Sequence, residues 1–424
     1  MSESNAMNDC AVIRVENTQL SGEQENAVEL CCDIRSRIVS VTGGAGTGKT
    51  LILGYAFHEL SKKYSVALCA PTGRAAKRIF ELTGIRAKTI HKLLEYPQPN
   101  EKEYDEDGNE ITPRNEPKRN SANPFDEHII MVDESSMIGP ELYHQLVAAL
   151  QKKGAIRFFG DNNQLLPVEE GPPPFRTILA KFPSVTLTFN FRSDDEIVGN
   201  AYRILHGKIP LRNYRFEIRY EDNPILALIK FVEKYPEYAD DSSQIIMPTR
   251  KGNVGTLRIN PSIQVKLNSG KELLRLPRFD EKERELVVRA NDKFLWIKND
   301  YQLDLFNGEI GRIAKINTDD GTVWLRTSEG RSIEIPPSIR AYNAYLRTTI
   351  NYDPRKQLEL GYAITTHKAQ GSEFDSIVYC ISSASPFLLN RNNFYTAVTR
   401  AKSRVIIIAD RKSMAMSLRR EKRD

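Results

Sequence analysis

The feature that most constrains this chain is a glycine-rich loop, Gly43-Gly44-Ala45-Gly46-Thr47-Gly48-Lys49-Thr50. It fits the pattern G-x-x-x-x-G-K-[ST], and it lies between a predicted buried strand at 37–41 and a predicted helix at 51–60. In that context backbone N–H groups converge on phosphates, and the helix N-terminus adds a positive field. We predict that Lys49 binds the β- and γ-phosphates of a nucleotide and that Thr50 binds Mg²⁺. The alternative, a glycine-rich turn with an incidental lysine, is disfavoured by this context.

An acidic pair follows a later predicted strand. Residues 128–132 are apolar, and Asp133 and Glu134 come directly after them. After a phosphate loop, such an aspartate is suited to hold Mg²⁺ through water and such a glutamate to act as general base on the attacking water. Without the loop, a solvated turn would be the better interpretation.

A polar loop, residues 160–168, follows the next predicted strand. Loops at the carboxyl edge of a parallel sheet face the crevice where ligands bind. We predict that Gln164 in this loop holds the attacking water or senses the γ-phosphate. A plain surface amide is the alternative.

These groups stabilise little transition-state charge without an arginine, and such arginines contribute about 10³ to 10⁵ in rate. Arg192, in Asn190-Phe191-Arg192, and Arg400, in the segment 392–402, are the candidates by position. Either residue can equally form a surface salt bridge, so the chemistry alone does not choose between the roles.

Composition fits a soluble globular protein. The 424 residues are 40% hydrophobic and 27% charged, and no apolar run is long enough to span a bilayer. The five cysteines include no C-x-x-C pair, which argues against a disulfide framework or zinc site and favours a reducing compartment. The net charge of +5 permits nucleic-acid binding without implying it.

Strands alternate with helices in two parts of the chain, which predicts an α/β fold with two parallel-sheet cores. A polar stretch carries an Asp-Gly turn between two short strand candidates and predicts an inserted hairpin. A later stretch of short strands between turns predicts a small barrel-like insertion. The predicted organisation is a flexible tail (1–18), a first core (19–94 and 126–189), the hairpin (95–125), a second core (190–267 and 356–424) and the β-rich insertion (268–355).

The motifs, in this order, resemble those of superfamily 1 DNA helicases, in the branch represented by RecD and the phage protein Dda. The resemblance covers roughly residues 20–410. Similar segments are 69–77 to motif Ia, 89–91 to the short motif after it, 132–137 to motif II, 160–168 to motif III, 190–192 to the motif IV arginine, 363–373 to motif V and 395–402 to motif VI. Leu166, where a second Pro is usual, and Ser135, where Val or Ala is usual, depart from the family pattern but touch no predicted catalytic group.

The resemblance implies two RecA-like cores, a hairpin that acts as a duplex-splitting pin, and an SH3-like β-barrel at 268–355. It implies that Gln24 reads the adenine edge, and that Gly371 and Glu373 couple nucleotide to DNA, with Glu373 near the ribose. Gln164, Arg192 and Arg400 would contact the γ-phosphate, the last two from the second core, so that the cleft closes on ATP and opens on ADP. Contacts to the DNA backbone fall to Pro71, Thr72, Arg74, Thr89, His91, Thr249, Arg250, Thr366, His367 and Lys368.

The sequence therefore predicts an ATP- and Mg²⁺-dependent DNA helicase that moves along single-stranded DNA, 5′→3′ by resemblance, and acts at junctions of single and double strands. We expect a monomer in the cytoplasm of a bacterial or phage-infected cell, without membrane contact, with replication or recombination proteins as candidate partners. Two rival classes stay open. One is an ATP-gated nucleic-acid clamp or protein remodeller without unwinding. The other is a phosphate-loop kinase, which would need neither Arg400 nor a second core.

Overall fold

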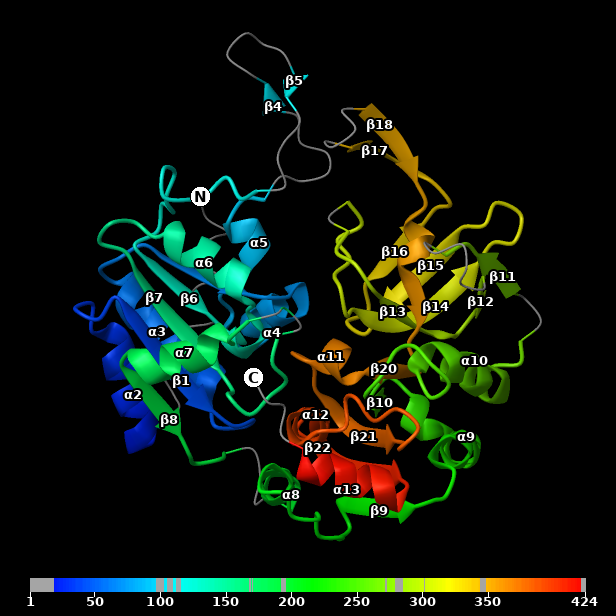
Figure 1. Cartoon of the computed structure of the whole chain (residues 1–424). Coiled ribbons are helices and arrows are strands. Elements are labelled where there is room, and N and C mark those ends of the chain that lie inside the picture. Colours follow the sequence, from blue (N-terminus) through cyan, green and yellow to red (C-terminus); the bar gives the residue numbers. More distant parts are fainter. Residues whose placement is uncertain are drawn as a thin grey trace. The chain divides into compact units, whose positions relative to one another are not determined.

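The computed structural model describes residues 19–96, 103–104, 110–111, 116–167, 169, 171–191, 196–270, 273–278, 285–300, 302–343 and 348–420 (Figure 1). Described residues up to 191 lie in one compact unit, unit 1, and those from 196 onward in a second, unit 2. The predicted tail, residues 1–18, lies outside the described residues, and so does Arg192. Within the described ranges, no helix has the length and apolar character needed to cross a membrane.

Unit 1 is built on a six-stranded, fully parallel sheet in the order β3-β2-β6-β7-β1-β8. Its strands are β1 (Ile38–Gly43), β2 (Val66–Ala70), β3 (Lys88–Thr89), β6 (Ile129–Val132), β7 (Ala155–Gly160) and β8 (Ser184–Leu187). Its helices are α2 (Gly22–Cys32), α3 (Lys49–Ser61), α4 (Gly73–Thr83), α5 (Ile90–Leu93), the 3₁₀ turn η1 (Ser135–Met137), α6 (Pro140–Ala148) and α7 (Pro174–Lys181).

Apolar side chains of the unit 1 sheet point alternately to two buried faces, as expected when helices cover both. Ile129 and Met131 belong to a core shared with α2, α3 and α4. Ile130 and Val132 belong to a core shared with α5, α6 and α7. The prediction of a parallel-sheet α/β core in this part of the chain is confirmed.

The predicted inserted hairpin falls between α5 and β6. Strand β4 (Glu103–Tyr104) pairs antiparallel with β5 (Glu110–Ile111). The Asp-Gly turn that was predicted to join them lies outside the described residues.

Unit 2 contains a five-stranded parallel sheet in the order β20-β10-β21-β22-β9. Its strands are β9 (Phe216–Tyr220), β10 (Ser243–Met247), β20 (Ala363–Thr365), β21 (Phe374–Ile381) and β22 (Ala401–Ala409). Its helices are α8 (Glu196–Leu205), α9 (Pro224–Lys234), η2 (Pro236–Ala239), α10 (Thr256–Leu267), α11 (Thr366–Ala369), α12 (Arg391–Val398) and α13 (Arg411–Arg419). Two buried clusters again flank the sheet, one with α8, α12 and α13 and one with α9 and α10.

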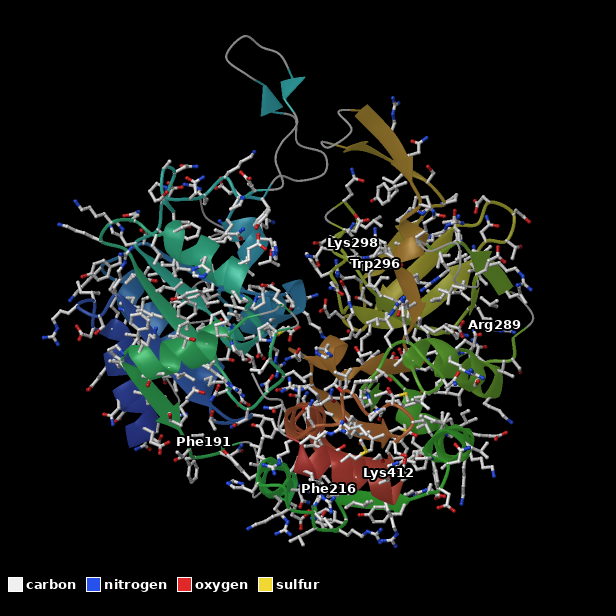
Figure 2. All side chains as sticks on the ribbon, in the orientation of Figure 1. Phe191, Phe216, Arg289, Trp296, Lys298 and Lys412 are labelled. Atoms are coloured by element: carbon white, nitrogen blue, oxygen red, sulfur yellow. The ribbon has the colours of Figure 1, made fainter. Side chains whose placement is uncertain are left out.

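A second, antiparallel sheet of unit 2 has the order β16-β15-β14-β13-β19. Trp296 is fully buried in its core (Figure 2). The strands are β13 (Lys293–Trp296), β14 (Ile310–Ile316), β15 (Val323–Thr327), β16 (Ser332–Ile335) and β19 (Leu358–Leu360), which follows the 3₁₀ turn η3 (Pro354–Gln357). Two antiparallel ribbons accompany it, β11 (Leu273–Leu276) with β12 (Leu286–Arg289) and β17 (Ile339–Asn343) with β18 (Thr348–Tyr352).

This antiparallel sheet extends past residue 355, where the insertion was predicted to end, because β19 pairs with β13. The chain then passes from the antiparallel sheet to the parallel one within a few residues, at Gly361. A Cβ atom at Gly361 would lie 2.4 Å from the carbonyl oxygen of Phe294. Glycine is therefore required at this crossing, because any side chain there would collide with the backbone of β13.

Arg157 occupies the middle of β7 and is fully buried. Its guanidinium donates hydrogen bonds to the carbonyl oxygens of Cys31 at 2.6 Å, Ser36 at 3.0 Å and Asp33 at 3.1 Å. These carbonyls belong to the end of α2 and the turn that leads into β1. The side chain thus satisfies helix-end carbonyls that have no partner within the helix.

We predict that Arg157→Met lowers the free energy of unfolding of unit 1 by about 3 kcal/mol, because several buried carbonyls lose their donor. Urea denaturation of the full chain, followed by circular dichroism, measures the loss. Arg35→Met is the matched control: Arg35 pairs with Asp33 at 2.8 Å but is exposed, and exposed pairs contribute about 0–1 kcal/mol. Equal losses of unfolding free energy in the two variants would contradict the stabilising role given to the buried hydrogen bonds of Arg157.

Candidate nucleotide and nucleic-acid sites

Parallel pairing brings the predicted nucleotide-binding residues of unit 1 to one edge of the sheet. Thr42 of β1 is opposite Gly160 of β7, and Val132 of β6 is opposite Phe158 of β7. The phosphate loop, the acidic pair and the polar loop after β7 therefore all leave the sheet at its carboxyl edge, where ligands bind in such sheets.

The phosphate loop has the backbone that its glycines allow. Gly46 and Gly48 have φ of 81° and 84°, in the left-handed region. A Cβ at Gly43 would lie 2.6 Å from Thr47 Oγ1, which donates to the Gly44 carbonyl at 2.9 Å. Lys49 Nζ donates to the carbonyls of Gly43 and Gly44, both at 2.8 Å, so the cation lies against the loop.

The two predicted metal ligands are in contact. Thr50 Oγ1 donates to Asp133 Oδ2 at 3.2 Å, and the backbone N–H of Glu134 donates to Asp133 Oδ1 at 2.8 Å. Burial raises the pKa of Asp133, and the Glu134 N–H and the Lys49 cation oppose that shift. A hydroxyl and a carboxylate oxygen are hard ligands of the kind Mg²⁺ prefers, so the donor set fits this ion.

Glu134 has a left-handed backbone with φ of 50°. This conformation is uncommon for a residue with a side chain, and such outliers concentrate at functional sites. Here it begins the 3₁₀ turn η1 immediately after the strand. The predicted base is thereby placed beside the predicted metal ligand.

Gln164 is buried after β7, and its Nε2 donates to Asp161 Oδ2 at 3.4 Å. Asp161 also accepts from the backbone N–H of Asn163 at 3.0 Å, so this fully buried carboxylate orients the loop. Within the described part of the chain, Gln164 Oε1 accepts no hydrogen bond. That oxygen suits a role in holding a water. Asp161 was not among the predicted site residues, although its place directly after a strand was a signal.

Gln24 joins helix α2 to the phosphate loop. Its Oε1 accepts from the backbone N–H of Ser21 at 3.0 Å, which completes a capping box with the Ser21 side chain. Its Nε2 donates to the Thr47 carbonyl at 3.2 Å. Both amide atoms thus have partners within the protein, and the predicted contact with adenine stays a prediction.

Residues 188–191 were not expected at the phosphate loop, since 190 was predicted to begin the second core. Thr188 donates to Glu23 from its N–H at 2.8 Å and its hydroxyl at 2.5 Å, which lowers the pKa of Glu23. Asn190 Nδ2 donates to the Ala45 carbonyl, and the N–H of Phe191 donates to the Gly46 carbonyl at 2.9 Å. Phe191 itself is exposed (Figure 2). The centroid of its ring lies 4.7 Å from that of Phe189.

The predicted DNA contacts of unit 1 follow two neighbouring strands. Ala70 of β2 is opposite Thr89 of β3, which brings Pro71, Thr72 and Arg74 close to Thr89 and His91. Thr72 caps α4 by accepting from the N–H of Ala75 at 3.1 Å, and Thr89 caps α5 by accepting from Lys92 at 3.2 Å. Pro71 and Arg74 are half-buried, and His91 is exposed. The structure therefore gathers this set, and it gives the two threonines a structural role as well.

The predicted DNA contacts of unit 2 also come together, because Met247 of β10 is opposite Thr365 of β20. Thr249 and Arg250 follow the first strand, and residues 366–368 follow the second. Several of these side chains bind within unit 2. Thr366 is fully buried and donates to Asn393 Oδ1 at 2.7 Å. His367 is half-buried.

Arg250 and Lys368 contact the antiparallel sheet region. Arg250 Nη2 donates to Glu359 of β19 at 2.6 Å. Lys368 Nζ donates to the Ile297 carbonyl at 3.4 Å and to Asn307 Oδ1. Burial lowers the pKa of Lys368, and the carboxylate of Glu359 opposes that shift. Both cations therefore tie the second core to the β-rich region, and their contact with DNA stays a prediction.

Arg400 is buried in unit 2 beside the predicted motif V residues. Its Nε donates to the Thr396 carbonyl at 3.1 Å and its Nη1 to the Ser372 carbonyl at 3.3 Å. Gly371, with φ of 71°, needs the left-handed freedom of glycine, and Glu373 is half-buried. The contact with Ser372 thus places Arg400 next to the loop that carries Gly371 and Glu373.

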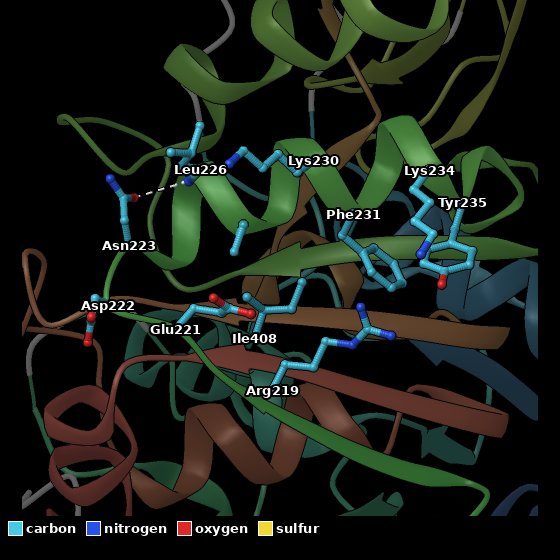
Figure 3. A pocket seen from close by; sticks show the side chains of 11 residues that line it. Arg219, Glu221, Asp222, Asn223, Leu226, Lys230, Phe231, Lys234, Tyr235 and Ile408 are labelled. Carbon is cyan, nitrogen blue, oxygen red and sulfur yellow. Dashed lines mark hydrogen bonds between the residues drawn. The ribbon is translucent and has the colours of Figure 1, made fainter.

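A hollow of about 360 Å³ lies between α9 and the edge strand β9 (Figure 3). Arg219 stacks over the ring of Phe231 at 4.6 Å and bonds to Glu217 at 2.6 Å. Asn223 caps α9 by accepting from the N–H of Leu226 at 3.1 Å. The predicted site residues do not line this hollow.

The parallel sheet of unit 1, with the phosphate loop and the acidic pair at its carboxyl edge, has the architecture of a phosphate-loop nucleotide-binding core. Unit 2 contains a second parallel sheet. Residues 24–170 match the family described as AAA domain, and residues 360–408 match the UvrD-like helicase C-terminal domain. The chain is 31% identical over 401 residues to the ATP-dependent RecD2 DNA helicase of Deinococcus radiodurans, an alignment that covers 93% of this chain and 50% of that protein. It is 25% identical over 451 residues to the RecBCD enzyme subunit RecD of Mycolicibacterium smegmatis, covering 95% and 73%.

Solved structures show a related fold. The structure of Bacteroides Pif1 bound to ssDNA has a TM-score of 0.59 at 21% identity, covering 94% of both chains. Pif1 helicases studied at forked dsDNA give a TM-score of 0.61 at 20% identity, with the same coverage. The chain spans about half the length of RecD2, the first of these relatives. The predicted resemblance to RecD-like helicases of superfamily 1 is confirmed.

We predict that Gln24→Glu weakens binding of ATP and GTP alike, by about tenfold, because the donor to the Thr47 carbonyl is lost while the acceptor for Ser21 is kept. Dissociation constants for both nucleotides, measured by equilibrium titration, test this. Exposed Gln302→Glu is the control for the added charge. Weaker binding of ATP with unchanged binding of GTP would show instead that Gln24 reads adenine.

Proposed function

We propose that this chain is an ATP-dependent DNA helicase that moves 5′→3′ along single-stranded DNA and separates duplex strands. The observation that carries the proposal is the contact between Thr50 and Asp133 at the edge of the parallel sheet, beside Glu134. The phosphate loop and the residues proposed as metal ligands and as base thus lie on the same core. The similarity to RecD2 and RecD along nearly the whole chain supports DNA as the track.

The proposed chemistry divides among the residues of this edge. Lys49 and the loop N–H groups bind the β- and γ-phosphates. Glu134 accepts a proton from the attacking water, and Gln164 Oε1 holds that water in place. Mg²⁺, when bound by Thr50 and Asp133, would neutralise phosphate charge. Arg192 and Arg400 are the proposed contacts to the γ-phosphate.

We propose that residues after β2, β3, β10 and β20 contact the DNA backbone without reading sequence. The hairpin of β4 and β5 is the proposed strand-separating pin, and the antiparallel sheet region is the proposed SH3-like domain. Single-stranded DNA and its junctions with duplex are the proposed partners. We propose that the chain acts on them as a monomer.

We predict that Lys49→Ala lowers DNA-stimulated ATP hydrolysis by at least about 100-fold, since a phosphate clamp that acts in the transition state is removed. Release of inorganic phosphate at saturating single-stranded DNA measures the loss. Lys62→Ala, on an exposed lysine just after α3, should leave the rate unchanged. A Lys49→Ala protein that unwinds a 5′-tailed duplex at the wild-type rate would overturn the mechanism.

The direction of movement is tested with matched duplexes that carry a single-stranded tail at either end. We expect strand separation with the 5′ tail and little with the 3′ tail, together with ATP hydrolysis that single-stranded DNA stimulates strongly. ATP hydrolysis that DNA stimulates without strand separation would favour the clamp or remodeller. Turnover indifferent to DNA would favour a kinase.

A further inference from the structure

The two segments that flank the inserted hairpin, residues 94–96 and 117–126, are joined by backbone hydrogen bonds, and we call this paired region the neck. The N–H of Arg119 donates to the Leu94 carbonyl at 3.1 Å, and the N–H of Lys118 donates to the Glu95 carbonyl at 3.3 Å. Glu95 has a left-handed backbone, with φ of 55°, at the point where the chain leaves the core. The segment that leaves the core and the segment that returns to it are therefore hydrogen-bonded to each other before the chain enters β6.

One guanidinium closes this neck. Arg119 Nε donates to Glu95 Oε1 at 2.9 Å, on the outgoing segment. Its Nη1 and Nη2 donate to the two carboxylate oxygens of Asp126 at 3.1 and 2.6 Å, at the re-entry point, and Nη1 also donates to the Pro124 carbonyl at 2.9 Å. The Arg119 side chain is only 16% exposed although both carboxylates face solvent. A planar fork of donors can span two acidic groups in this way, and a lysine cannot.

The neck is also fastened to the core beside a predicted DNA contact. The Tyr96 hydroxyl donates to Gln145 Oε1 of α6 at 2.7 Å, and the Tyr96 ring lies 5.1 Å from that of His91. On the returning side, the N–H of Phe125 donates to the Ala149 carbonyl at 2.8 Å, and the Phe125 side chain is buried. A change in the neck therefore alters how the hairpin leaves the core.

We propose that Arg119 is a positioning residue for strand separation: it locks the neck so that the hairpin keeps a fixed direction relative to the first core. This inference rests on the proposed role of the hairpin as a pin. A pin that pivots at its base yields when the duplex pushes against it. A locked pin transfers the motion of the core to the base pairs. Loss of the lock should uncouple ATP hydrolysis from unwinding while leaving the nucleotide site intact.

The test compares Arg119→Ala and Arg119→Lys with the wild-type full-length chain. We expect Arg119→Ala to lower the rate of unwinding of a 5′-tailed duplex by five- to tenfold, with a larger loss on GC-rich than on AT-rich duplex. ATP hydrolysis on single-stranded DNA and the translocation rate along it should stay within twofold. Arg119→Lys should recover only part of the unwinding, because one ammonium cannot bridge Glu95 and Asp126.

Two further variants separate the lock from general stability. Arg35→Met removes an exposed, bidentate arginine–aspartate pair elsewhere on unit 1 and should leave unwinding unchanged. Glu95→Gln removes one charge from the neck and should lower unwinding by less than Arg119→Ala does. Parallel losses of unwinding, single-strand ATP hydrolysis and translocation in Arg119→Ala would overturn the inference, since they would indicate a merely structural residue. Unchanged unwinding in Arg119→Ala would overturn it as well.

A variant with residues 97–115 replaced by a short Gly-Ser linker separates this inference from the proposed function. If the linker variant loses unwinding but Arg119→Ala does not, the pin stands and the lock fails. If the linker variant unwinds as the wild type does, the pin itself fails, and the lock fails with it. Loss of unwinding in both, with ATP hydrolysis on single-stranded DNA preserved, supports the inference.

Discussion

The parallel pairing of β1, β6 and β7 is the constraint on which the nucleotide site depends. Because each strand of a parallel sheet must return to the same side, three loops distant in the sequence leave the sheet together at its carboxyl edge. The alternation of two buried faces fixes their register, since a slip of one residue would exchange the two cores. Hydrophobic packing of the strands thus decides that Thr50 meets Asp133.

Buried polar side chains then hold the loops that the sheet has gathered. Gln24 caps its own helix and bonds to the phosphate loop, and Asp161 orients the loop that carries Gln164. Arg157 donates to carbonyl oxygens at the C-terminal end of α2, the helix that contains Gln24. Each of these groups is buried, and a buried polar group without a partner is costly. Replacing any one of these side chains would therefore change the position of α2, of the phosphate loop or of the loop with Gln164.

Local patterns predicted the parts of this arrangement that depend on neighbouring residues. The glycines of the phosphate loop and the acidic pair after a strand both followed from spacing. The contacts of Arg157 depend on residues more than one hundred positions away, and no local pattern encodes them. The same holds for β19. It joins the antiparallel sheet by pairing with β13, which lies about sixty residues earlier in the chain.

The threonines of the predicted DNA-binding motifs show why one residue type serves two purposes. A threonine hydroxyl has acceptor lone pairs and one hydrogen to donate. The hydroxyl oxygens of Thr72 and Thr89 each accept a hydrogen bond from a backbone N–H in the first turn of a helix, as an N-cap residue does. The hydroxyl hydrogen is a donor suited to a phosphate oxygen, and the capped helix begins at the same place. Folding and backbone recognition therefore make compatible demands at these positions. Valine, which has the same shape without the hydroxyl, would fail both demands, whereas serine would meet them.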